Sequence, residues 1–156
     1  MGVLDKISRL VTGSGAGDAT RAVRECYVDC VQRAQQLRRH AAMAPQTYST
    51  EGLDELAAAE DQQAERLREA LRAAGETAPP VPAAALPGGA LNHWGRLVQD
   101  LERHRAAVRR LRELAVHFAE SLPATAELFD QLCREEAIHS ERLRTLIARA
   151  DPQALD

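Results

Sequence analysis

The chain has 156 residues, which suits one domain with a single core, and it is 45% hydrophobic and 28% charged, a balance typical of folded rather than disordered proteins. Ala, Leu, Arg and Glu dominate and aromatic residues are few, which predicts an all-α fold. The net charge is −3 with acids and bases interspersed, so nothing indicates a nucleic-acid-binding face, and no apolar run approaches the roughly 18 residues of a membrane span.

Residues 1–17 differ from the rest of the chain. Five apolar residues share one helix face: Val3, Leu4, Ile7, Leu10 and Val11. The stretch TGSGAG follows them and is predicted to be a flexible linker. The segment has no signal-peptide cleavage pattern, and Lys6 stands where myristoylation requires Ser or Thr. Two interpretations remain open: a short helix that packs on the domain, or a docking peptide for a partner protein, a shell protein or a membrane surface.

Two helices are predicted next. The first runs from about Asp18 to Met43, and its inward stripe is Val23, Tyr27, Cys30, Ala34, Leu37 and Ala41. The second runs from about Thr50 to Ala74 and ends at Gly75, with the inward stripe Leu53, Leu56, Glu60, Gln63, Leu67 and Leu71. Because the connection between them is short, we expect an antiparallel pair.

The segment 75–90 contains four prolines and three glycines, which exclude regular helix for most of its length. Its 16 residues reach about 50 Å when extended, whereas the preceding helix is roughly 36 Å long. We therefore expect this segment to cross the whole domain, so that the next helix starts at the end where the second helix began.

A third helix is predicted from Leu91 or Asn92 to about Ser121. Its inward stripe is Trp94, Leu97, Leu101, His104, Val108, Leu111, Ala115 and Phe118. A fourth helix follows, with Ser121 as its cap and Pro123 in its first turn. It ends near Ala150 and leaves residues 152–156 as a tail.

The fourth helix carries an acid and an imidazole on its apolar stripe, which is Phe129, Leu132, Glu136, His139, Leu143 and Leu146. Glu136 and His139 are three residues apart and so point into the same space, as in the Glu-x-x-His motif by which helical bundles hold metals. Displaced by 76 residues, EDQQAERLREALRAA (60–74) aligns without gaps to EAIHSERLRTLIARA (136–150), which indicates two copies of one helical unit. The first copy has Glu-x-x-Gln instead.

These two runs and the crossover resemble the ferritin-like superfamily, above all rubrerythrin-like and bacterioferritin-like domains, over about residues 18–151. The resemblance implies a four-helix bundle whose di-iron site takes a carboxylate from each of helices 1 and 3 and Glu-x-x-His from each of helices 2 and 4. Glu60, Glu136 and His139 match this pattern, whereas Gln63 stands where a histidine belongs. The two lone carboxylates have no counterpart, because the corresponding positions fall at Tyr27 and at Arg103, beside His104.

Glu25 and Glu102 are the nearest acids, and both lie off the inward stripes unless a π-bulge turns Glu102 inward. The metal site is therefore predicted to be incomplete, with candidate ligands Glu60, Glu136, His139, Gln63 and His104. Two carboxylates can balance one divalent ion, such as iron, manganese or zinc. The alternative is a metal-free buried network in which His139 is protonated against Glu136.

Two functions remain open at this stage. In the first, the chain is a non-catalytic ferritin-like bundle that acts through binding or assembly, as a homodimer or by docking a partner or shell through residues 1–17. In the second, it is a metal-binding, rubrerythrin-like oxidoreductase domain that uses Glu60, Glu136 and His139. The sequence gives no signal for haem, and Cys26, Cys30 and Cys133 are interpreted as small core residues of a cytoplasmic protein.

Overall fold

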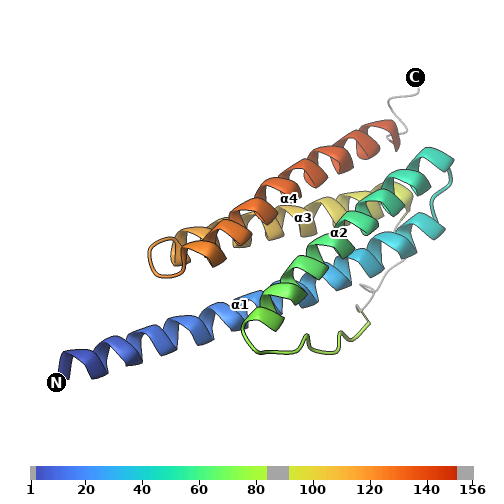
Figure 1. The fold of residues 1–156 in the computed structure, drawn as a ribbon. Coiled ribbons are helices and arrows are strands. Elements are labelled where there is room, and N and C mark those ends of the chain that lie inside the picture. The colour runs from blue at the N-terminus through green and yellow to red at the C-terminus, as the bar shows by residue number, and fades with distance from the viewer. Residues whose placement is uncertain (1–2, 84–91, 151–156) are drawn as a thin grey trace.

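The structure, a computed structural model, describes residues 3–83 and 92–150, with side chains from residue 15 onward. Four helices account for most of it (Figure 1): α1 (Val3–Ala42), α2 (Thr47–Ala73), α3 (His93–Phe118) and α4 (Pro123–Ala150). The described residues contain no strand, which confirms the predicted all-α fold. None of the helices in this part of the chain is long and apolar enough to cross a membrane.

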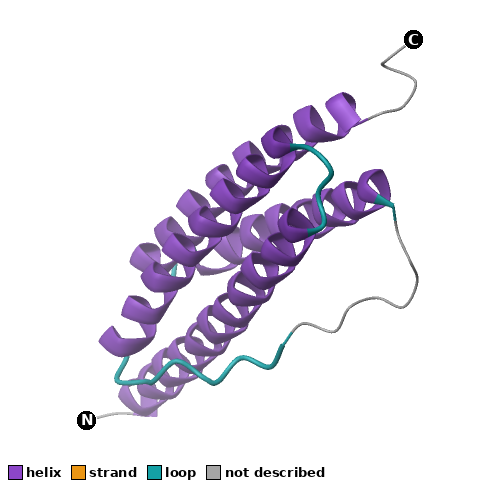
Figure 2. Cartoon of the chain, turned by 90° about the vertical axis from the view of Figure 1, so that its right-hand side faces the viewer, coloured by secondary structure: helices purple, strands orange, loops and turns teal. Residues whose placement is uncertain are grey.

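The helices form two antiparallel hairpins, because α1 packs mainly on α2 and α3 mainly on α4. In Figure 1, α1 and α4 run in one direction and α2 and α3 in the other, so the second hairpin starts at the end of the bundle where α2 starts. The described part of the connection after α2 runs along α1 (Figure 2): Arg24 pairs with Glu76 at 2.8 Å, and Gln32 donates to the carbonyl of Pro82. This arrangement confirms the predicted crossover.

The ends of α2 and α3 follow from local sequence. Gly75 has φ +78°, and its N–H donates to Arg72 O at 3.0 Å while Glu76 N donates to Leu71 O at 2.9 Å. These two bonds form a Schellman motif, which satisfies carbonyls that the helix itself leaves unpaired. At the start of α3, the Asn92 side chain accepts a hydrogen bond from Gly95 N at 2.7 Å. The predicted glycine stop is confirmed, and α3 begins within one residue of the predicted start at Leu91 or Asn92.

The prediction of a flexible linker before residue 18 is wrong for the backbone, because α1 is one continuous helix from Val3. Adding residues to an existing helix gains a hydrogen bond for each residue without a new nucleus, and this gain offsets the entropic cost of the glycines. The first residues of α1 extend beyond the other helices in Figure 1. A separate functional role for residues 1–17 stays a prediction, and the tail 152–156 lies outside the described residues.

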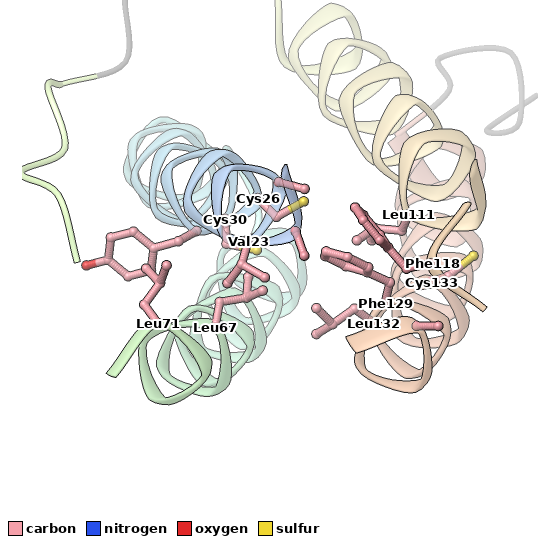
Figure 3. Close-up of a cluster of buried hydrophobic side chains, with 14 of the residues drawn as sticks. Val23, Cys26, Cys30, Leu67, Leu71, Leu111, Phe118, Phe129, Leu132 and Cys133 are labelled. Atoms are coloured by element: carbon pink, nitrogen blue, oxygen red, sulfur yellow. The ribbon is translucent and has the colours of Figure 1, made fainter. Parts of the chain in front are cut away.

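Two apolar clusters form the core. Figure 3 shows one of them, in which Phe118 and Phe129 lie 6.1 Å apart between the two hairpins and face Leu67 and Val23. The other contains Leu37, Leu53, Leu56, Leu97, Leu143 and Leu146. The prediction that Trp94 lies in the core is wrong, because its side chain is 43% exposed. In that first turn of α3, the ring of His93 faces Ser49 instead.

Candidate functional site

A charged layer separates the two apolar clusters, and each helix contributes to it. Along α2, Glu60 lies between Leu56 and Leu67, and along α4, Glu136 and His139 lie between Leu132 and Leu143. The same periodicity that makes these helices amphipathic therefore places two carboxylates inside the bundle. α3 adds His104, and the four side chains are buried with ligand atoms within 4.8 Å of one another.

Glu136 is the centre of this cluster. Its Oε2 is 2.7 Å from Nδ1 of His104, and its Oε1 is 3.4 Å from Nδ1 of His139. Glu60 lies opposite, with Oε1 at 3.5 Å from Nδ1 of His104 and 3.4 Å from Nδ1 of His139. The sequence-predicted residues Glu60, Glu136, His139 and His104 are thus brought together.

The contribution of α1 is an arginine that sequence reasoning missed. Nη2 of Arg33 lies 2.9 Å from Oε2 of Glu60 and 3.5 Å from Oε1 of Glu136, and its Nε donates to the same Glu60 oxygen at 3.1 Å. Nη2 also donates to Sγ of Cys30 at 3.2 Å. Because a guanidinium does not lose its proton in proteins, a permanent positive charge is held between the two buried carboxylates.

The protonation states follow from these contacts. Burial disfavours the charged form of Glu136, but the charge of Arg33, the hydrogen bond with His104 and the close contact with His139 outweigh burial and hold the pKa of Glu136 well below its usual value. Burial likewise opposes a charge on His139, but its contacts with Glu136 and Glu60 raise its pKa to about 9. At neutral pH, Arg33 and protonated His139 therefore balance the two carboxylates.

The donor set can be compared with the groups that this fold holds. A di-iron centre does not fit, because the resemblance calls for four carboxylates and here α1 supplies a cation and α3 a histidine. A single divalent ion fits better, since Oε1 of Glu60 and Nδ1 of His139 have no hydrogen-bond partner although they lie 3.4 Å apart. Ligands about 2.1 Å from a tetrahedral ion are themselves about 3.4 Å apart.

Other residues considered from sequence lie outside the cluster. The Gln63 amide is buried but donates to Oε2 of Glu135 at 3.1 Å, and its oxygen faces Cys30. The Tyr27 hydroxyl accepts a hydrogen bond from Arg68. Glu25 and Glu102 have exposed side chains and pair with arginines, as their positions off the stripes predicted, and no π-bulge turns Glu102 inward.

A sequence signal for Arg33 does exist. In α1, Ala19, Cys26, Arg33 and His40 recur every seven residues and are all buried, along the edge of the predicted stripe. An arginine in such a column must find negative partners, because a buried unpaired charge is costly. His40, the last of these four residues, belongs to a second buried network. In it, His40 Nδ1 lies 2.7 Å from Oδ2 of Asp100, and Gln36 donates to Oδ1 of Asp100 at 2.6 Å.

The cysteines have no role in ligation here. All three are buried and free, and burial raises the pKa of Cys26 to about 11 and that of Cys30 well above its usual value. Thiols with such pKa values are poor nucleophiles and poor metal ligands at neutral pH. Their interpretation as small core residues is confirmed.

No protein-family model matches the chain, and no curated protein matches it. Solved structures do. A Mycobacterium tuberculosis bacterioferritin, BfrA, has 16% identity over 88% of this chain and 90% of its own, with a TM-score of 0.76. A second structure of BfrA from M. tuberculosis has 17% identity over 82% of this chain and 81% of its own, with a TM-score of 0.73.

A Desulfovibrio desulfuricans bacterioferritin, whose structure was described for its diiron site in different catalytic states, has 15% identity. That match covers 88% of this chain and 82% of its own, with a TM-score of 0.74. At such identities the likeness establishes the fold and not the activity. The chain has the ferritin-like four-helix bundle fold.

Proposed function

We propose that this protein is a non-catalytic ferritin-like bundle whose charged layer is closed by Arg33 and protonated His139 instead of iron, and that it acts through binding or assembly. The observation that carries the proposal is the guanidinium of Arg33, which contacts both Glu60 and Glu136. In a metal centre those two carboxylates would face the metal ion. Here the guanidinium of the same protein contacts both carboxylates, and with protonated His139 it offsets their charge.

Charge explains why this arrangement disfavours metal. With His139 protonated, the two positive charges of Arg33 and His139 offset the two carboxylates of Glu60 and Glu136. A divalent ion would displace the proton of His139 and still leave one excess positive charge beside Arg33. An unbalanced charge in a buried site costs several kcal/mol. Two divalent ions would leave three excess positive charges. This set of residues therefore does not support the chemistry of a di-iron oxidase.

The proposed partners follow the ferritin-like resemblance: a second copy of the chain, in a homodimer, or a partner or shell protein reached through residues 1–17, within the cytoplasm. Large apolar side chains that remain exposed on the described surface offer contact area for such assembly, with Val116 73% and Ile138 60% exposed. No haem ligand is proposed.

Elemental analysis of the protein purified from cells supplied with iron, manganese and zinc tests the proposal, beside the double variant Glu136→Ala/His139→Ala. We expect far less than one metal ion per chain in both proteins, and light scattering after size exclusion to show the same assembly with and without a chelator. About one or two ions per wild-type chain, lost in the double variant, would overturn the proposal.

A second candidate function is a single-metal site held by Glu60, Glu136, His139 and His104. The specific observation in its favour is the spacing of 3.4–3.5 Å between Oε1 of Glu60 and the two imidazole nitrogens, together with the unpartnered atoms on Glu60 and His139. Such an ion would supply Lewis acidity or redox chemistry in the core. The elemental analysis separates this candidate from the first, because it requires one ion per chain.

A further inference from the structure

The outer side of Arg33 opens to a groove between α1 and α3 that the charged layer does not use. The groove has a volume of about 230 Å³, and we call it the arginine groove; its lining residues are Asp29, Arg33, Arg103, Ala106, Ala107 and Arg110. Three of the six residues are arginines, which present planar sets of N–H donors suited to oxyanions.

Two alanines make room in this groove. Arg103 and Arg110 are seven residues apart on α3, which places them two turns apart on one face, and Ala106 and Ala107 lie between them. Because alanine side chains are short, the space between the two guanidinium groups is not filled from α3 itself. The arrangement leaves a concave site that is lined by Arg103, Arg110 and Arg33.

Arg33 and Arg103 keep donors that none of the contacts described above uses, whereas Nη1 and Nη2 of Arg110 pair with Asp29 and Glu25. Arg33 reaches the carboxylates and Cys30 through Nε and Nη2, and none of these contacts uses Nη1. Arg103 donates from Nη1 to Oε1 of Gln36 at 2.6 Å. Within the described residues Arg103 forms no ion pair with a carboxylate, so its charge is the least compensated of the three.

Arg103 is held in place by the second buried network. The Gln36 amide that accepts its hydrogen bond is itself fixed by Asp100, which His40 also contacts. Gln36 and Asp100 are almost fully buried, so this support is rigid and does not depend on solvent. Burial and the nearby charge of Arg33 lower the pKa of Arg103, which agrees with a positive charge that lacks a partner.

Asp29 sets the selectivity. It accepts a hydrogen bond from Arg110 at 3.3 Å and is the one acid among the described residues that line the arginine groove. A carboxylate repels an oxyanion that carries no proton, but it accepts a hydrogen bond from one that does. Phosphate keeps a proton near neutral pH and sulfate does not, so this residue favours phosphate.

We propose that the arginine groove binds one small oxyanion, inorganic phosphate, between Arg103, Arg110 and Arg33, with Asp29 accepting its proton. This site goes beyond the proposed role in assembly and does not depend on whether the charged layer holds a metal. It gives the bundle an anion site on the opposite side of Arg33 from the two glutamates.

Isothermal titration of the full chain with inorganic phosphate, in chloride buffer with a chelator, tests this proposal. The variant Arg103→Gln removes the least compensated charge, and Arg105→Gln is its matched control, because Arg105 lies on the same helix, is half-buried and pairs with the exposed Glu102. We expect one phosphate per chain, at least about tenfold weaker binding in Arg103→Gln, and a change within about twofold in Arg105→Gln. Circular dichroism verifies that both variants are folded, and Arg110→Gln provides a second variant that lacks a guanidinium of the groove.

Sulfate provides the second arm of the experiment. We expect sulfate to bind at least about fivefold more weakly than phosphate to the wild type, and Asp29→Asn to bring the two affinities together. The proposal is overturned if about 10 mM phosphate gives no binding heat. It is equally overturned if Arg103→Gln and Arg105→Gln weaken binding to the same extent, or if sulfate binds as well as phosphate.

Discussion

Replacement of Arg33 by methionine removes the permanent positive charge that lies between Glu60 and Glu136 and keeps most of the side-chain volume. At an effective dielectric constant of about 20, two unit charges about 4 Å apart attract by about 4 kcal/mol, and Arg33 has two such partners. The variant also removes the cost of burying the guanidinium away from water, and this offsets part of the lost attraction. We therefore expect a loss of about 3–5 kcal/mol in the free energy of unfolding at pH 7.

Urea unfolding followed by circular dichroism measures this loss, with a chelator present in every sample. Arg105→Met is the matched control, since its partner Glu102 is exposed, and it should cost less than about 1 kcal/mol. The triple variant Arg33→Met/Glu60→Gln/Glu136→Gln should be at least about 2 kcal/mol more stable than Arg33→Met alone, because it removes the stranded charges. A loss below about 1 kcal/mol in Arg33→Met, or a triple variant that is weaker still, would refute the reasoning.

Three further predictions concern single positions. Folding raises the pKa of His139 to about 9, so the stabilisation by protonated His139 is complete below about pH 6.5 and is lost as the pH rises to about 9. The free energy of unfolding should therefore fall by about 3 kcal/mol over this range, and His139→Gln should flatten the fall. Gly75→Ala should lower the stability by about 1–2 kcal/mol, because φ is +78°, whereas Gly17→Ala, in a helix with open space around it, should leave the stability equal or higher; thermal melts compare the two. Phe129→Ala should cost about 3–5 kcal/mol in urea unfolding, since the ring is fully buried, and the exposed Val116→Ala should change it by less than about 0.5 kcal/mol.

The fold was predictable from the sequence because several local signals agree. Every residue of the predicted stripes of α2 and α4 is buried, and the glycine at 75 and the asparagine at 92 mark real helix ends. The length of the segment 75–90 predicted its crossover from reach alone. Local signals failed at the start of α1, where glycines suggested a break, because continuation of a helix depends on the helix already formed and not only on residue propensity.

The candidate site was predictable in part. Glu60, Glu136, His139 and His104 lie on inward stripes, so their convergence follows from helical periodicity. Arg33 was missed because an arginine beside a stripe is ordinarily solvated. Only the packing of the two hairpins against each other places its guanidinium between an acid of α2 and an acid of α4. The partner of Gln63 was also beyond sequence reasoning, because Glu135 comes from the opposite hairpin.

A crystal structure of the protein grown with iron, manganese and zinc, with anomalous difference maps collected at each metal edge, tests the central claim most directly. We expect no anomalous peak between Glu60 and Glu136, and the guanidinium of Arg33 within hydrogen-bond distance of Glu60. A peak about 2.1 Å from oxygens of both glutamates and from a nitrogen of His139, with Arg33 turned away, would contradict the claim that Arg33 takes the place of the metal.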